Sequence, residues 1–198
     1  MSGKPGLVDE EDAVLVVIDV EEKLYRVMAH KERLVSNIAK LIKVCRLLGI
    51  PVLLTEQYPE GLGVTIEEVR RELGDCYKPV RKTSFSCFGE ESFVRRLEET
   101  GRKTLLLTGI ELHVCVAQTA LEAAELGYRP VVVLDATSSR SVEEYEMGVR
   151  RLVARGVDVA STEAVIFELL RDASRPEFRS VLSLIKGGSS RSSSADPR

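Results

Sequence analysis

The chain has 198 residues, of which 44% are hydrophobic and 30% are charged. This length and balance are typical of a globular protein with one domain and one sizeable core. The formal net charge of −3 provides no attractive field for nucleic acid, so we expect no nucleic-acid partner. No apolar run approaches the roughly 20 residues that a membrane span needs, and the first residues do not form an apolar signal core. We therefore expect a cytoplasmic protein with no membrane partner.

The cysteines and histidines argue against a metal centre. The four cysteines form no C-x-x-C pair and have no regular disulfide spacing. With only two histidines in the chain, a zinc site of the usual ligands is not expected. We expect neither a metal nor another cofactor. A Cys76–Cys87 disulfide stays open, although a reducing compartment argues against it.

The first half of the chain alternates strand-like and helix-like segments. Residues 13–19 are nearly all β-branched or apolar, which is typical of a strand buried on both faces. Residues 31–48 carry apolar side chains at helical spacing, and Gly49 ends this predicted helix before a strand at 51–55. A loop rich in Gly and Pro follows. The other elements predicted in this half are a helix at 65–73 with Thr65 as its N-cap, a weak strand at 77–81 and a helix at 90–100.

The second half continues the alternation, which indicates an α/β fold with a parallel sheet. The predicted elements are strands at 103–108, 130–135 and 157–160, and helices at 115–126, 142–154, 162–170 and 176–185. Six strands with crossover helices predict a Rossmann-like, three-layer α/β/α sandwich around a six-stranded parallel sheet. We divide the chain into an N-terminal extension (1–11), one domain (12–186) and a Gly- and Ser-rich tail (187–198) that we expect to be disordered.

Three chemically complementary residues follow strands of the predicted sheet. Asp19 ends the first strand, Lys82 follows the third and Cys115 follows the fourth. The carboxyl ends of parallel strands share one edge of a sheet, where α/β proteins bind ligands. A thiol in the first turn of a helix feels the positive end of the helix dipole, which favours the thiolate. Taken singly, these residues have ordinary interpretations as a turn cap, a solvated charge and a core cysteine. Their common edge favours a reactive site.

Three motifs carry a resemblance to a known family. They are 17–23 (VIDVEEK), 82–88 (KTSFSCF) and 108–116 (TGIELHVCV). On these motifs the chain resembles the isochorismatase-like superfamily of cysteine hydrolases, which includes nicotinamidases and N-carbamoylsarcosine amidases. The segments 55–63 (TEQYPEGLG) and 135–141 (DATSSRS) are similar to the branch of isochorismatase domain-containing proteins. The resemblance covers residues 13–186 and implies the isochorismatase-like hydrolase fold.

The resemblance also implies a site. It implies a catalytic triad of Asp19, Lys82 and Cys115, and a cis peptide bond between Ile110 and Glu111. The backbone amides of Glu111 and Cys115 are then expected to form an oxyanion hole. Because relatives assemble into dimers, tetramers or larger rings, we expect a homo-oligomer, either a dimer or a tetramer.

Departures from relatives narrow the chemistry. Metal-dependent nicotinamidases carry histidines in the loop after the second strand, whereas residues 56–63 contain none, which disfavours a metal-assisted reaction. A Cys–His dyad with His113 is less favoured, because side chains two apart on a helix do not face each other. His113 is better interpreted as lining or buttressing the pocket. The side chains expected to line the substrate pocket are Tyr25, Gln57, Tyr58, Phe85, Phe88 and His113.

The leading hypothesis is a metal-independent cysteine hydrolase that cleaves a C–N bond of a small amide or ureido-type substrate through a thioester. One alternative is a catalytically weak binding or scaffold member of the superfamily. Another is an isochorismatase-type vinyl-ether hydrolase, although relatives of that type often lack a cysteine. A third is a redox-sensing thiol protein in which Cys87 approaches Cys115 in space.

Overall fold

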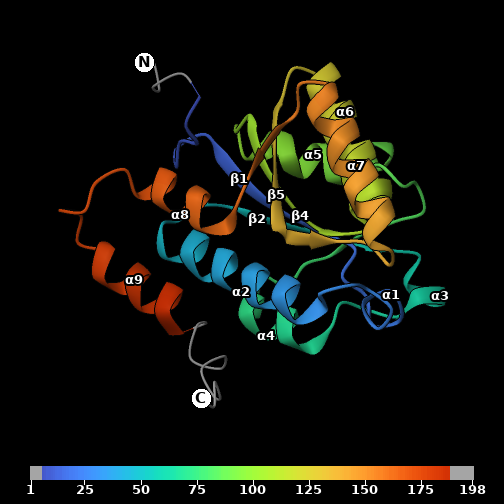
Figure 1. Cartoon of the computed structure of the whole chain (residues 1–198), viewed down its shortest axis with the longest axis horizontal. Coiled ribbons are helices and arrows are strands. Elements are labelled where there is room, and N and C mark those ends of the chain that lie inside the picture. The colour runs from blue at the N-terminus through green and yellow to red at the C-terminus, as the bar shows by residue number, and fades with distance from the viewer. Residues whose placement is uncertain (1–5, 188–198) are drawn as a thin grey trace, which may run out of the picture.

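The computed structural model describes residues 6–187, and a parallel sheet of six strands forms its centre (Figure 1). The strands are β1 (Ala13–Ile18), β2 (Val52–Gln57), β3 (Val80–Lys82), β4 (Thr104–Ile110), β5 (Arg129–Ser138) and β6 (Asp158–Ala160). Their order across the sheet is β3-β2-β1-β4-β5-β6, and every pairing is parallel. The central strands β1 and β4 are buried along their whole length, as their apolar sequences predict.

Helices cover both faces of the sheet (Figure 1). Those described are α1 (Glu22–Tyr25), α2 (Lys31–Leu47), α3 (Pro59–Leu62), α4 (Glu67–Leu73), α5 (Glu91–Glu99), α6 (Ala117–Glu125), α7 (Val142–Ala154), α8 (Thr162–Leu170) and α9 (Phe178–Gly187). One apolar core lies between the sheet and α2, α4, α8 and α9, and a second lies between the sheet and α5, α6 and α7. These layers confirm the predicted three-layer α/β/α sandwich.

The segment after β4 differs from the prediction. The five residues Leu112–Val116 form a π-helical turn, here called the π-turn, in which the Val116 N–H donates to the Glu111 carbonyl oxygen at 3.3 Å. The α-helix α6 begins only at Ala117. The helix predicted at 115–126 therefore begins earlier, at Leu112, and Cys115 lies in its first turn as expected, but that turn is π-helical. Cys115 lies in the wider π-turn, a feature that is frequent at functional sites.

The connection after β2 also differs. The prediction that Thr65 caps a helix was wrong, because α4 is preceded by Ile66 and has no side-chain cap. Thr65 instead donates its hydroxyl to Glu56 Oε1 at 2.8 Å and forms an isolated antiparallel bridge with Glu21. The strand predicted at 77–81 is shifted: β3 runs from Val80 to Lys82. Lys82 is therefore its last residue and pairs with Gln57 of β2.

The chain ends and the cysteines complete the description. Part of the predicted N-terminal extension packs on the domain, since Val8 is buried and its N–H donates to Glu168 Oε2 at 2.8 Å. In the predicted tail, Gly187 ends α9 and residues 188–198 lie outside the described residues. All four cysteines are free thiols, so no Cys76–Cys87 disulfide is present. Across residues 6–187, no helix has both the length and the apolar character needed to cross a membrane.

Two glycines allow close approaches around the carboxyl edge of the sheet. Gly109 in β4 has a φ of +107°, and a Cβ there would lie 1.9 Å from the carbonyl oxygen of Ile18. In α7, a Cβ on Gly148 would lie 2.6 Å from Leu112 Cδ2 and 3.1 Å from the Cα of His113. Gly109 therefore lets β4 lie against the end of β1, and Gly148 lets α7 lie against the π-turn.

Replacing Gly109 by alanine should destabilise the fold strongly. The added Cβ overlaps backbone that cannot move without separating β1 from β4, so we expect a loss of at least about 4 kcal/mol in the free energy of unfolding. Gly127→Ala is the matched control, because Gly127 also has a positive φ (+80°) but no atom within 4 Å of a built Cβ. Its cost should be about 1–2 kcal/mol. Urea denaturation measures both variants, and equal losses would contradict the steric explanation.

Candidate active site

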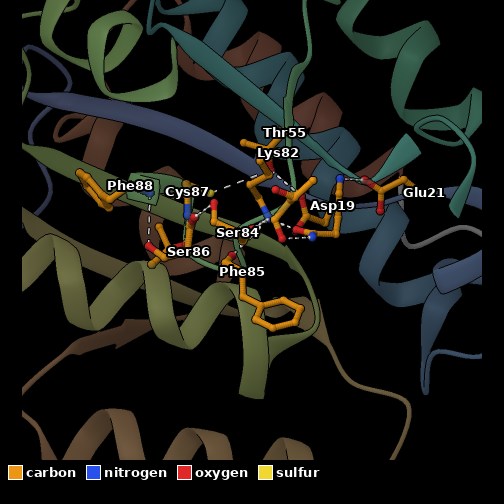
Figure 2. Close-up of polar contacts among 12 residues, drawn as sticks. Asp19, Glu21, Thr55, Lys82, Ser84, Phe85, Ser86, Cys87 and Phe88 are labelled. Atoms are coloured by element: carbon orange, nitrogen blue, oxygen red, sulfur yellow. Dashed lines mark hydrogen bonds and ion pairs between the residues drawn. The ribbon is translucent and has the colours of Figure 1, made fainter. Parts of the chain in front are cut away.

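A buried ion pair joins the ends of β1 and β3. Lys82 Nζ lies 2.6 Å from Asp19 Oδ2, and neither side chain is exposed. From the strand between them, the Thr55 hydroxyl donates to Asp19 Oδ1 at 2.7 Å (Figure 2). Asp19 directly follows β1 and has a φ of +53°, a left-handed conformation that is uncommon outside glycine and often found at functional sites. The parallel topology therefore brings Asp19 and Lys82 together, as the sequence predicts.

Further acceptors fix the Lys82 ammonium in place. Lys82 Nζ donates to Gln57 Oε1 at 2.5 Å, and to the carbonyl oxygens of Ser84 at 3.1 Å and Phe85 at 3.2 Å. The side-chain Nε2 of Gln57 in turn donates to the carbonyl oxygen of Thr83 at 2.7 Å. The loop after β3 thus curls around the ammonium, as Figure 2 shows for Ser84 and Phe85. Such a cage holds the cation against Asp19 and satisfies its donors in the absence of bulk water.

Cys115 completes the predicted group, since its thiol lies near enough to Asp19 and Lys82 for their charges to shift its pKa. Burial raises the pKa of Cys115, the charge of Asp19 raises it further, and Lys82 lowers it only in part. Contrary to the expectation from its place at the start of a helix, the burial of a thiol that is only 5% exposed disfavours the thiolate. Cys115 is a thiol at rest and needs a base in contact with it.

Asp19 has the properties of such a base. Burial raises the pKa of Asp19, while Lys82 and the hydrogen bond from Thr55 oppose the shift. Burial alone lowers the pKa of Lys82, but the charges of Asp19 and Cys115 raise it above its ordinary value. Lys82 therefore stays a cation, and Asp19 is more basic than an exposed carboxylate. A base with a raised pKa takes a thiol proton more readily.

The segment that leads into the π-turn offers a free backbone donor. The Ile110–Glu111 peptide bond is cis. Within residues 6–187 the Glu111 N–H has no hydrogen-bond acceptor, while its carbonyl oxygen accepts from the N–H groups of Val114 and Val116. The Glu111 carboxylate is held by the Arg140 N–H at 2.9 Å and lies 3.3 Å from Arg140 Nε. The side chain of Glu111 therefore anchors this segment, and the backbone N–H of Glu111 stays available as a hydrogen-bond donor.

His113 does not pair with Cys115, because both of its ring nitrogens contact other residues. Its Nδ1 lies 2.9 Å from Ser139 Oγ, and its Nε2 lies 3.8 Å from Glu144 Oε2. These contacts join the π-turn to Ser139, between β5 and α7, and to Glu144 in α7. His113 therefore braces the π-turn, and its expected role of lining or buttressing a substrate pocket stays a prediction.

The other residues expected in a substrate pocket are scattered. Gln57 contacts Lys82, and Phe85 contributes its carbonyl oxygen while its ring is 54% exposed. Tyr58 is exposed to the same extent and has a left-handed backbone. Phe88 packs edge-to-face against Phe93, and Tyr25 lies beside the core on the α2 side with the Lys31 ammonium 5.7 Å from its ring. Only Gln57 and Phe85 of this group therefore contact the buried ion pair.

A cavity of about 190 Å³ lies at the carboxyl end of β5, between the starts of α2 and α7. Its lining includes His30, Arg33, Ser139 and Tyr145, and none of the six expected pocket residues. The hydrogen bond between His113 and Ser139 connects its wall to the π-turn.

Two participants escaped the sequence analysis. Thr55 supports Asp19, and the only signal for it is a hydroxyl in an otherwise apolar strand. Cys87 was noted as a possible neighbour of Cys115 but not as part of the site. Its Sγ lies 4.0 Å from Thr55 Oγ1, and burial together with Asp19 raises its pKa to about 12. Two buried thiols, each with a raised pKa, therefore lie near the Asp19 carboxylate.

The fold and this Cys–Asp–Lys arrangement define an α/β protein of the isochorismatase-like class. Residues 13–164 match the family model described as the Isochorismatase domain, and the chain belongs to this family.

Its relatives span nearly the whole chain. Isochorismatase domain-containing protein 2A of Mus musculus is 37% identical over 182 residues, which cover 91% of this chain and 86% of that protein. The solved structure of the MAR1 ribonuclease from Caenorhabditis elegans is 29% identical, with a TM-score of 0.86 over 98% of this chain and 99% of that one. The YcaC gene product of Escherichia coli, described as an octameric hydrolase of unknown specificity, is 22% identical and has a TM-score of 0.80 over 94% and 99% of the two chains.

Replacing Asp19 by asparagine should make Cys115 more reactive toward an alkylating agent. The substitution removes the charge that raises the pKa of Cys115 and leaves Lys82, which lowers it. Each unit by which the pKa falls increases the thiolate fraction about tenfold, so we expect iodoacetamide at pH 7.5 to react at least about tenfold faster. The rate is measured by mass spectrometry in a Cys76→Ser background, because Cys76 is exposed.

Lys82→Met is the control for this measurement, because it should change the alkylation rate in the opposite direction. It removes the positive charge that lowers the pKa of Cys115, so alkylation should become slower than in the native protein. A change in the same direction for both variants would contradict the electrostatic assignment.

Proposed function

We propose that the protein is a metal-independent cysteine hydrolase that cleaves a C–N bond of a small amide or ureido-type substrate. The observation that carries the proposal is the placement of the Cys115 thiol beside a buried Asp19 that is itself ion-paired with Lys82. A nucleophile in contact with a base, with the base oriented by a third group, is the arrangement on which covalent catalysis depends. Family membership supports a hydrolase in general, and the amide chemistry is our own inference.

The first half of the reaction forms a thioester. Asp19 takes the proton of Cys115 as Sγ attacks the substrate carbonyl carbon, and the carbonyl oxygen becomes an oxyanion. The backbone N–H groups of Glu111 and Cys115 are proposed to receive this oxyanion, a contribution of several kcal/mol in a preorganised site. The intermediate then collapses: the C–N bond breaks, and Asp19 gives its proton to the leaving nitrogen.

The second half releases the acid product and restores the thiol. Asp19 takes a proton from a water molecule as the water oxygen attacks the thioester carbon. The C–S bond then breaks, and the proton returns from Asp19 to the Cys115 sulfur. Lys82 keeps its charge throughout. Its role is to orient the Asp19 carboxylate and to stabilise the negative charge that alternates between oxygen and sulfur.

A catalytically weak binding member of the family is the second candidate. The raised pKa of Cys115 favours it, because a thiol that stays protonated is a poor nucleophile when no base assists it. Turnover separates the two candidates, since only the hydrolase consumes substrate. The expected homo-oligomer and the cytoplasmic location stay predictions.

Cys115→Ala should abolish hydrolysis in a panel of small amides and ureido compounds, measured as ammonia or amine release. Cys87→Ala is the matched control, because Cys87 is also buried near Asp19 but has no role in the proposed steps. It should keep activity within about tenfold of the native protein. Because the C. elegans relative is called a ribonuclease, the panel includes an RNA oligonucleotide. Amide turnover by the Cys115→Ala variant, or Cys115-dependent cleavage of the RNA alone, would overturn the proposal.

A further inference from the structure

Glu21 is a buried carboxyl group that the proposed reaction does not use. It follows Asp19 by two residues, and none of its surface is exposed. Its Oε1 accepts a hydrogen bond from the Gln57 N–H at 2.6 Å, whereas its Oε2 is buried without any partner in the described part of the chain. Figure 2 shows Glu21 on the side of Asp19 that is remote from Cys87 and Phe85.

The charges around Glu21 do not balance if it is ionised. Lys82 is the cation of the site, and it forms its ion pair with Asp19. Among the described residues, Glu21 has no cation within 4.0 Å. Two carboxylates and one ammonium would leave a net negative charge among fully or almost fully buried side chains, which is costly. Asp19 has both Lys82 and Thr55 as partners, so the proton that restores the balance belongs on Glu21.

Glu21 also contacts Gln57, the residue whose side chain accepts a hydrogen bond from Lys82. The main chain of Gln57 donates to Glu21, and the side chain of Gln57 accepts from Lys82 at 2.5 Å. We propose that Glu21 is a positioning residue of this site that works as a neutral carboxylic acid, holding Gln57 in place without competing with Asp19 for the ammonium. The consequence for catalysis rests on the function proposed above, but the protonation state of Glu21 does not.

The electrostatics of the surroundings support this assignment. Burial and the charge of Asp19 raise the pKa of Glu21 to about 9, against the lowering effects of the Gln57 N–H and of Lys82. Another acid near this segment is Glu56, which contacts Thr65, the bridge partner of Glu21. Its Oε1 accepts from the Thr65 N–H, the Thr65 hydroxyl and the Tyr77 hydroxyl at 2.6–2.9 Å. Glu56 is thus held by three donors, whereas Glu21 is held by one.

Ionisation of Glu21 should disturb the site. A second negative charge beside Asp19 would share the Lys82 ammonium. It would also add to the negative charge that already raises the pKa of Cys115, so the thiol would become harder to ionise. The neutral form of Glu21 therefore keeps a single carboxylate opposite a single ammonium at neutral pH.

The first test is a titration of the native protein labelled with ¹³C at the glutamate side-chain carboxyl carbons. We expect one glutamate resonance to titrate near pH 9, and we expect it to be missing in the Glu21→Gln variant. If no glutamate titrates above pH 7, the proposal is wrong. This measurement needs no substrate, so it gives an answer even if the protein hydrolyses no amide.

The second test is thermal stability at two pH values. An unfolded glutamate ionises near pH 4.3, whereas folded Glu21 stays protonated to about pH 9, so the native protein loses stability as the pH rises between these values. Glutamine escapes this loss. Relative to the native protein, the melting temperature of Glu21→Gln should therefore rise by at least about 3 °C between pH 5 and pH 8. A difference that stays constant or moves the other way contradicts a neutral Glu21.

Glu56→Gln is the matched control for this comparison. It makes the same chemical change at a neighbouring buried carboxyl, but there it weakens the acceptor of three hydrogen bonds. Its melting temperature should fall below the native value at both pH 5 and pH 8. If it shows the same rise as Glu21→Gln, the effect does not belong to Glu21 and the proposal fails.

The third test separates a positioning role from a purely structural one. Cys115 is alkylated with iodoacetamide at pH 7 and pH 10 in the Cys76→Ser background, with and without Glu21→Gln. At pH 7 the two rates should agree within about twofold, because both side chains at position 21 are neutral. At pH 10 Glu21→Gln should react at least about threefold faster, because only the native residue adds a charge that opposes the thiolate. The same rate ratio at both pH values would show that Glu21 does not act on Cys115.

Discussion

The buried ion pair between Asp19 and Lys82 is the interaction on which the rest of the site depends. It joins the ends of β1 and β3 across β2, and Thr55 and Gln57 of β2 support one partner each. Removing one partner of such a pair commonly costs about 3–5 kcal/mol, although a well-packed apolar pair in the same place is often no less stable. Stability alone therefore does not explain the pair. Its value lies in placing a basic carboxylate, with a fixed orientation, against the thiol of Cys115.

One ammonium balances a site rich in acidic groups. Two carboxyls and two thiols lie in the region of Lys82, although only Asp19 is paired with it, and burial raises the pKa of Asp19, Glu21, Cys87 and Cys115. Only one negative charge is well compensated at a time. The proposed reaction meets this limit, because the charge passes between Asp19, the Cys115 sulfur and the substrate oxygen while Glu21 keeps its proton.

Much of this arrangement could be predicted from the sequence. Apolar runs such as that of β1 are unambiguous, and parallel topology alone brings the residues after β1, β3 and β4 to one edge. The π-turn could not be foreseen, because an i to i−5 hydrogen bond leaves no mark on apolar periodicity. The raised pKa of Cys115 depends on burial, which a local motif does not reveal. Aromatic residues such as Phe88 and Tyr25 fit a pocket or a core equally well, and only tertiary packing decides between the two.

The central claim is that Cys115 attacks the substrate carbonyl with Asp19 as its base. The most direct measurement is rapid acid quenching of the native protein during turnover of an amide substrate, followed by mass spectrometry of the intact chain and its peptides. The account predicts a transient adduct with the mass of the acyl group, located on the peptide that contains Cys115. Substrate consumption with no acyl adduct, or with an adduct on another residue, would contradict it.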